Sequence, residues 1–311
     1  MPAIVVGVDV GGTKIAAVVL TADSDADGDG DRDVLAMRRS PTPADGGQLL
    51  EAIHALVAGL AEGHELRAIG LGLAGFIDAD GIARQAPNVP ALLDVDVPAA
   101  LRARFGVPVV ADNDANCAAW AARREAAAGE HHVVVVAIGT GIGGGLVVED
   151  RLVHGAHGFA GEPGHMVVDP AGDRCVCGRR GCWETVASGS ALDRAAVELF
   201  GPGADGAALF RTADETDETD AADAADAAEE VLAHYCDWLA LGIANLVNLL
   251  DPSMVLITGG IAAQGDALLR RLRAALSRLP TVFTGRSVEV RTVASGPDSA
   301  AIGAALIARL A

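Results

Sequence analysis

Residues 4–20 read IVVGVDVGGTKIAAVVL and are the most informative part of the sequence for the fold class. Two apolar runs, 4–8 and 15–20, predict β-strands joined by the turn Asp9-Val10-Gly11-Gly12-Thr13-Lys14. Glycines let backbone N–H groups approach an anion closely, Thr13 and Lys14 add donors, and Asp9 can hold Mg²⁺ through water. An ordinary glycine hairpin with a solvent-facing lysine explains the same residues, so the turn alone does not establish a phosphate site.

The same pattern returns later in the chain. A strand over 132–138 runs into the glycine turn 139–145, and a strand over 146–148 follows. A repeat after roughly 130 residues predicts two similar α/β domains facing each other across a cleft. Two such turns can clamp a polyphosphate from both sides, and Gly259-Gly260, after a strand over 254–258, suits the adenosine part of a nucleotide.

The remaining pattern is a mixture of strands and helices. Further strands are predicted near 34–38 and over 68–74 and 106–111. Helices are predicted over 47–62, 115–129, 227–250, 264–278 and 298–310, with another beginning near Ser190. Residues 149–185 read as irregular, and the polar stretch 201–220 is predicted to be a loop.

The charge of the chain is strongly negative and unevenly placed. The formal net charge is −19 over 311 residues, and the stretches 21–33 and 214–230 supply −5 and −9 of it. Both read as solvated surface, and an acidic surface repels nucleic acids and anionic membranes, so neither is expected as a partner. No signal-peptide pattern or membrane-spanning run is recognised, so we expect a cytoplasmic protein.

Asn113-Asp114 follows a predicted strand and precedes a predicted helix. Strand ends are where open α/β sheets place ligand-handling groups, and a carboxylate there can accept a proton from an attacking hydroxyl. Asp112, Asn113 or Asp114 can equally serve as a helix N-cap, a position that these residue types favour. Local sequence does not separate the two interpretations.

Three of the five cysteines form the cluster Cys175-Val-Cys177-Gly-Arg-Arg-Gly-Cys182. Three thiolates at this spacing can surround one tetrahedral Zn²⁺ in a closed structural site, whereas three buried free thiols are the alternative. A fourth ligand is required, and His165 and His157 are the upstream candidates. If His165 binds the metal through one ring nitrogen, the other can donate to a ligand. Glu162 and Glu184 flank this segment and suit recognition of sugar hydroxyls.

Taken together, these motifs resemble the ROK family of repressors, open reading frames and sugar kinases, within the actin-like ATPase superfamily. The resemblance spans nearly the whole chain. It rests on residues 9–14, 113–116, 138–145 and 161–165 and on the Cys-x-Cys-Gly-x-x-Gly-Cys-x-Glu pattern at 175–184. The sequence looks most like the ATP-dependent glucokinases of that family. The implied fold is α/β and ribonuclease H-like, with a small domain of residues 1–113 and 299–311 and a large domain of residues 114–298.

The resemblance also implies roles for individual residues. Asp114 would be the catalytic base that takes the proton of the sugar 6-hydroxyl. The remaining roles fall into three sets. The sugar would contact Asn88, Asn113, Asp114, Glu162, His165 and Glu184. ATP and Mg²⁺ would contact Asp9, Gly11, Gly12, Thr13, Lys14, Gly139, Thr140, Gly141, Gly259 and Gly260. Structural Zn²⁺ would be held by His165, Cys175, Cys177 and Cys182. The family also implies a homodimer or homotetramer.

Other functions remain open at this point. Within the same chemistry, the sugar can be N-acetylmannosamine, N-acetylglucosamine, fructose, mannose or allose instead of glucose. A sugar-responsive repressor shares the sugar domain but needs a DNA-binding module, for which a strand beginning at Ile4 leaves no room. A non-catalytic sugar sensor is disfavoured because Asp9, Lys14 and Asp114 are all present.

Overall fold

The computed structural model describes residues 2–23, 34–93, 95–214, 219–279, 288–294, 296 and 298–311. Residues 24–33 of the first acidic stretch and 215–218 of the second, which were interpreted as solvated surface, lie outside the described residues. The chain forms two compact units. The first contains residues 1–131, 145–161 and 295–311, and the second contains residues 132–144 and 162–294.

The first unit is built on a five-stranded sheet with the order β3-β2-β1-β4-β7. Its strands are β1 (Ala3–Val10), β2 (Lys14–Thr21), β3 (Val34–Pro41), β4 (Glu65–Leu73) and β7 (Val109–Asn113). β1 pairs antiparallel with β2 and parallel with β4, and β4 pairs parallel with β7. The predicted strands at 4–8 and 15–20 and the turn between them are therefore confirmed.

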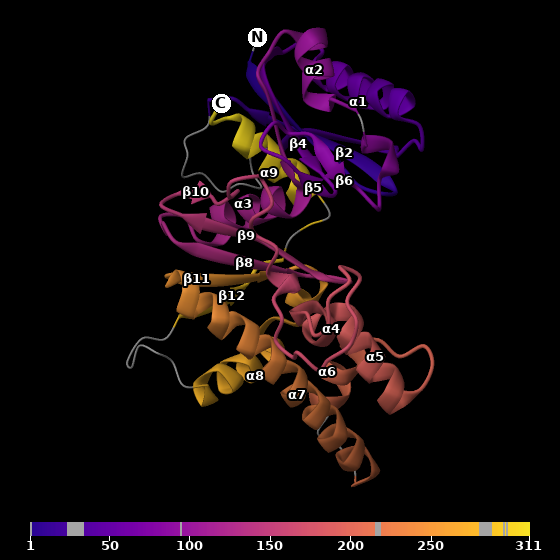
Figure 1. Cartoon of the computed structure of the whole chain (residues 1–311), viewed down its shortest axis with the longest axis vertical. Helices are drawn as coiled ribbons and strands as arrows, with labels where there is room; N and C mark the ends of the chain where they lie inside the picture. The colour runs from indigo at the N-terminus through magenta and orange to yellow at the C-terminus, as the bar shows by residue number, and fades with distance from the viewer. Residues whose placement is uncertain are drawn as a thin grey trace. The chain divides into compact units, whose positions relative to one another are not determined.

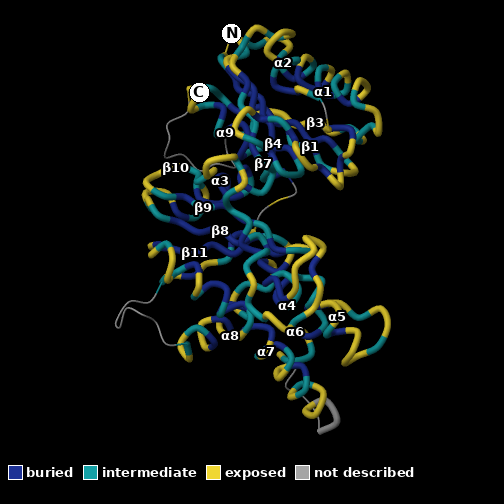
Figure 2. Tube along the Cα trace, viewed as in Figure 1, coloured by how far each residue is buried: buried dark blue, intermediate teal, exposed yellow. Residues whose placement is uncertain are grey.

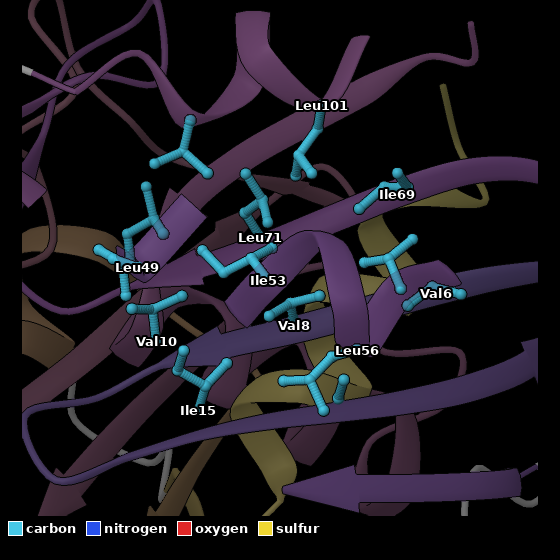
Figure 3. Close-up of a cluster of buried hydrophobic side chains, with 14 of the residues drawn as sticks. Val6, Val8, Val10, Ile15, Leu49, Ile53, Leu56, Ile69, Leu71 and Leu101 are labelled. Atoms are coloured by element: carbon cyan, nitrogen blue, oxygen red, sulfur yellow. The ribbon is translucent and has the colours of Figure 1, made fainter. Parts of the chain in front are cut away.

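Helices cover both faces of this sheet. On one face, α1 (Gly46–Ala61) and α2 (Val97–Phe105) bury Leu49, Ile53 and Leu101 against the strands, as Figure 3 shows. On the other face, α9 (Ser299–Ala308) lies along β1 and β4 and also contacts α3 (Asp114–Ala126). The predicted helices over 47–62, 115–129 and 298–310 are confirmed.

A second five-stranded sheet has the order β10-β9-β8-β11-β12. Its strands are β8 (Val133–Ile138), β9 (Ile142–Val148), β10 (Arg151–Leu152), β11 (Met254–Thr258) and β12 (Glu289–Thr292). The order repeats that of the first sheet, with a hairpin followed by parallel strands, and β11 pairs parallel with both β8 and β12. This repetition confirms the predicted duplication. Figure 2 shows β8 and β11 as buried.

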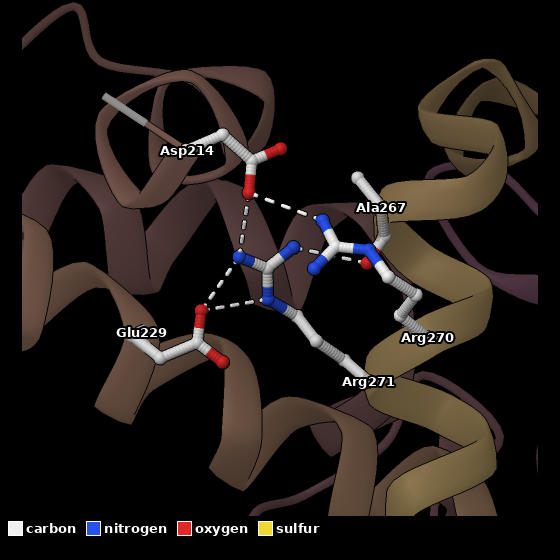
Figure 4. Close-up of polar contacts among 5 residues, drawn as sticks. All are labelled: Asp214, Glu229, Ala267, Arg270 and Arg271. Atoms are coloured by element: carbon white, nitrogen blue, oxygen red, sulfur yellow. Dashed lines mark hydrogen bonds and ion pairs between the residues drawn. The ribbon is translucent and has the colours of Figure 1, made fainter. Parts of the chain in front are cut away.

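The helices of the second unit pack on one another around a long helix (Figure 1). α7 (Thr219–Leu250) contacts α4 (Trp183–Ala187), α5 (Gly189–Phe200), α6 (Gly206–Asp214) and α8 (Gly265–Arg278). One buried guanidinium joins three of them. Arg271 of α8 donates to Glu229 of α7 at 2.6 Å and to Asp214 of α6 at 2.9 Å, as Figure 4 shows.

The prediction of a loop over 201–220 is wrong, because this stretch contains α6 and the beginning of α7. Two carboxylates stabilise the start of α6. Asp193 accepts from the Gly206 N–H at 2.7 Å and Asp205 accepts from the Ala208 N–H at 2.9 Å. The helix then buries Leu209 and Phe210. Long-range contacts, which local polarity does not reveal, therefore decide this segment.

The prediction of a strand over 106–111 is shifted. Gly106 ends α2 in the left-handed conformation, with φ 68°, and β7 begins only at Val109. No predicted helix corresponds to α2, whose N-cap Asp96 accepts from the Ala99 N–H at 2.8 Å. No helix in the described part of the chain is both long enough and apolar enough to cross a membrane.

The predicted domain boundary after residue 113 differs from the grouping of the compact units, because α3 packs against α9 and belongs to the first unit. The boundary after residue 113 stays a prediction.

Candidate functional site

The first unit gathers carboxylates at one edge of its sheet. Asp9 of β1 pairs in register with Gly72 of β4, which in turn pairs with Asp112 of β7. Asp114 begins α3 two residues further on. Because parallel strands end at the same edge of a sheet, the predicted Mg²⁺ ligand Asp9 and the predicted base Asp114 lie at the same edge of this sheet.

The environment of this edge changes the acidity of both groups. The pKa of Asp9 is raised to about 7, chiefly by burial and also by the neighbouring Asp114, while Lys14 lowers it. Burial also raises the pKa of Asp114, against the lowering effect of the hydrogen bond from the Ala115 N–H. A carboxylate with a raised pKa is a stronger proton acceptor than an exposed one, which suits general-base work.

Two hydrogen bonds stabilise the turn between β1 and β2. Thr42 donates its hydroxyl to the Gly11 carbonyl at 2.7 Å, and the Gly11 N–H donates to the Lys14 carbonyl at 3.1 Å. Gly12 and Thr13 are exposed. A Cβ at Gly12 would lie 2.8 Å from the carbonyl oxygen of Asn88, so the structure places this predicted sugar-binding residue beside the predicted phosphate turn.

Asn113 is the N-cap of α3. Its side-chain oxygen accepts from the Ala115 N–H at 2.8 Å and the Asn116 N–H at 3.2 Å, and its Nδ2 donates to the Gly75 carbonyl at 2.8 Å. The capping interpretation therefore holds for its oxygen. Nδ2 carries a second N–H, for which no hydrogen-bond partner is found among the described residues, and a ligand can accept it.

In the second unit, the predicted zinc ligands come together. The donor atoms of His165, Cys175, Cys177 and Cys182 all lie within 4.8 Å of one another. The Cys177 and Cys182 sulfurs are 3.5 Å apart, and Nδ1 of His165 is 3.6 Å from the Cys175 sulfur. Tetrahedral zinc with bonds of about 2.3 Å to sulfur separates its sulfur ligands by about 3.8 Å. The set fits zinc, and His165, not His157, supplies the imidazole.

Tight backbone turns shape this cluster. The Gly178 N–H donates to the Cys175 carbonyl at 3.0 Å, and the Cys175 N–H donates to the Arg179 carbonyl at 2.8 Å. Gly181 has φ 69°, and a Cβ there would lie 1.4 Å from the Asp169 carbonyl oxygen, so only glycine fits. The pKa of the Cys177 thiol is lowered to about 6, with the hydrogen bond from the Arg179 N–H as the largest cause, which favours the thiolate that zinc requires.

Glu184 links the cysteine cluster to the second glycine turn. Its Oε1 lies 2.9 Å from the Cys175 sulfur and 3.5 Å from Nδ1 of His165. A Cβ at Gly141 would lie 2.7 Å from its other oxygen. Glu162 precedes the 3₁₀ turn Pro163–His165 that carries His165. Because Nδ1 faces the sulfurs, Nε2 is the nitrogen of His165 left for a ligand.

A cavity of about 340 Å³ in the second unit brings together predicted nucleotide residues from separate segments. It lies where β8 and β11 end and α5 begins, and its lining includes Gly139, Thr140, Gly189, Asp193, Asp205 and Gly260. The Gly189 N–H donates to the Gly139 carbonyl at 2.8 Å, which joins α5 to the glycine turn. Gly259 has φ 85° and directly follows β11, which pairs with β8.

Three polar residues near these sites are not among the predicted site residues. Asp193 and Asp205 line the cavity just described. His154, which carried no recognisable context, lies 2.7 Å from Asp112 in the first unit. His154 and Asp193 depend on contacts between distant segments, whereas Asp205 caps α6 locally and only the tertiary structure places it at the cavity.

Known proteins resemble the chain over nearly its whole length. The glucokinase of Streptomyces coelicolor is 33% identical over 320 residues, covering 98% of this chain and 97% of that protein. The N-acetylmannosamine kinase of Yersinia pseudotuberculosis is 31% identical, covering 97% of each. The crystal structure of a ROK family glucokinase from Streptomyces griseus, in complex with glucose and AMPPNP, matches with a TM-score of 0.76 at 32% identity, covering 99% and 100%.

These likenesses agree with the two sheets of repeated topology and identify the fold as the actin-like ATPase fold. The model of the ROK family matches residues 5–310. The chain is a member of the ROK family.

Proposed function

We propose that this protein is an ATP-dependent hexose kinase that phosphorylates glucose at the 6-hydroxyl, with Asp114 as the general base. The observation that carries the proposal is the placement of Asp114. It begins α3 at the sheet edge that also carries Asp9, and burial raises its pKa. Glucokinase relatives that match nearly the whole chain support the reaction class.

The proposed reaction is an in-line phosphoryl transfer. The sugar hydroxyl oxygen attacks the γ-phosphorus, the bond to the β-phosphate oxygen breaks, and ADP leaves. The hydroxyl proton passes to the Asp114 carboxylate and then to solvent. Mg²⁺ bound with the nucleotide neutralises phosphate charge, and Asp9 is the residue proposed to hold it. The Gly11–Lys14 turn and Gly139–Gly141 would supply N–H donors to the phosphates.

We assign sugar selection to five polar residues. The sugar would contact Asn88, Asn113, Glu162, His165 and Glu184. Zinc, bound by His165 and the three cysteines, would fix the imidazole so that Nε2 donates to a sugar hydroxyl. Carboxylates and imidazole groups held rigidly in this way discriminate hydroxyl stereochemistry through paired hydrogen bonds.

A second substrate class has support from one observation. The N-acetylmannosamine kinase of Yersinia pseudotuberculosis matches this chain at 31% identity with 97% coverage. The same fold, zinc ligands and base would serve that sugar, and only the pocket residues would differ. Fructose, mannose, allose and N-acetylglucosamine are further members of this alternative.

The test is a coupled assay of ADP release with Mg-ATP against glucose, mannose, fructose, allose, N-acetylmannosamine and N-acetylglucosamine. We expect glucose to have the highest kcat/KM. Preference for an N-acetylated sugar would overturn the substrate but keep the reaction. Absence of turnover on every sugar, with zinc bound and the protein folded, would overturn the kinase and favour a sugar sensor.

The surroundings of the reaction follow from its chemistry. We propose the cytoplasm as the location, because ATP is available there and reduced thiols are maintained for the zinc site.

We also propose a homodimer or homotetramer, as the family resemblance implies. Size-exclusion chromatography with light scattering measures the mass of the assembly and would reveal a monomer.

A further inference from the structure

His154 reaches a buried carboxylate at the sheet edge of the first unit. It follows β10, and its Nε2 lies 2.7 Å from Oδ2 of Asp112. The Asp112 side chain is only 8% exposed, whereas that of His154 is 48% exposed. Since a carboxylate oxygen accepts, Nε2 is the ring nitrogen that carries the proton. The pKa of His154 is raised by this hydrogen bond, which favours a charge-assisted pair.

The second oxygen of Asp112 holds the turn that leads into α3. Oδ1 accepts from the Asn113 N–H at 2.7 Å and from Nδ2 of Asn116 at 2.8 Å. Asn116 is 3% exposed, so this network is buried at its centre. Asp114 lies between these two anchored residues. The three donors to Asp112 therefore determine the backbone path on which the proposed base stands.

The segment that carries His154 is itself anchored. The Val153 N–H donates to the Leu146 carbonyl at 2.9 Å, and the Ala160 N–H donates to the His154 carbonyl at 3.1 Å, which closes the loop. A Cβ at Gly145 of β9 would lie 2.5 Å from the Cβ of Ala119, so β9 and α3 pack closely. The backbone hydrogen bonds hold the segment that carries His154, and the acceptor Asp112 is buried. His154 therefore differs from a histidine in an ordinary surface ion pair.

We propose that His154 is a positioning residue for phosphoryl transfer, which acts through Asp112 to hold the β7–α3 turn so that the Asp114 carboxylate keeps its orientation. The inference rests on the proposed role of Asp114. The alternative is that His154 and Asp112 form a half-exposed ion pair that adds little to stability and nothing to the reaction.

The test compares His154→Leu, which removes the donor, with His154→Gln, whose amide N–H can replace Nε2–H. His157→Leu is the matched control, since His157 is an exposed histidine of the same loop. In single-turnover transfer with saturating ATP and the preferred sugar, we expect His154→Leu to slow the transfer step about 10- to 100-fold, with a smaller loss of sugar affinity because Asn113 stands on the same turn. His154→Gln should stay within about threefold of wild type, and His157→Leu should match it.

Amide hydrogen exchange provides a measurement that does not depend on activity. In His154→Leu, the amides of Asn113 and Asn116 should exchange faster than in wild type, while amides in β2 keep their rates. Equal impairment of the Leu and Gln variants, an effect on sugar affinity alone, or unchanged exchange at Asn113 would overturn the inference. If the wild type phosphorylates no sugar, the proposed function fails by itself, and the exchange rates still decide whether His154 holds the turn.

Discussion

Replacing Asp9 by asparagine should stabilise the protein while it damages the proposed reaction. The pKa of Asp9 is raised from 3.8 to about 7, chiefly by burial. The folded state therefore binds the proton more tightly than the unfolded state does, so stability falls as pH rises from about 4 to about 7. Above pH 7 the full cost of the buried charge is present.

The magnitude follows from the shift. One pKa unit corresponds to about 1.4 kcal/mol, so a rise of about 3 units costs the ionised protein about 4 kcal/mol. Asparagine removes the charge, and with it the repulsion toward Asp114, but its buried amide retains part of the desolvation cost. We therefore expect Asp9→Asn to raise the free energy of unfolding at pH 8 by about 2–4 kcal/mol.

Urea unfolding at pH 5, 6, 7 and 8, without Mg²⁺ or nucleotide, measures this effect. The wild type should lose stability across that range, and Asp9→Asn should lose less. Asp80→Asn, at an exposed carboxylate in the turn between β5 (Phe76–Ile77) and β6 (Ala83–Gln85), is the control and should follow the wild type. An Asp9→Asn protein no more stable than wild type at pH 8 would show that burial of the Asp9 charge does not destabilise the folded state.

Three further predictions concern other parts of the molecule. Asp114→Asn should lower kcat by about 10²–10⁴-fold with sugar binding retained in calorimetry, and unchanged turnover of this variant would exclude the base role. Because the pKa of Asp114 is raised, the wild-type rate should begin to fall with decreasing pH at pH values above those at which an ordinary aspartate titrates. Cys177→Ser should reduce zinc content measured by mass spectrometry from one ion per chain and weaken sugar binding, whereas full zinc retention would argue against the Cys₃His set. Arg271→Met should destabilise the second unit by about 1–3 kcal/mol in thermal unfolding, because it leaves Glu229 without its partner. Arg270→Met should change stability by less than about 0.5 kcal/mol, since its side chain is 64% exposed against 7% for Arg271. Equal effects of the two arginine variants would contradict this account.

Much of the fold was predictable because local patterns carry it. The apolar runs around 4–20 and 132–148 specify hairpins, and their repetition indicates two sheets of the same topology. The limits of prediction appear at α6, whose capping carboxylate Asp193 lies thirteen residues away from Gly206. They appear also at α2, since the sequence predicts a strand that begins at Gly106, whereas Gly106 ends a helix.

The candidate site divides in the same way. The sequence predicts the three cysteines as metal ligands, because thiolates at that spacing can surround one ion and the glycines allow the turns. It left the fourth ligand open between two histidines, and only the tertiary structure selected His165. The acidity of Asp9 and Asp114, and the contact of His154 with Asp112, were likewise decided by the structure. The reason is physical: desolvation and long-range hydrogen bonds arise from the register of strands and the packing of helices, which bring together residues that are far apart in the chain.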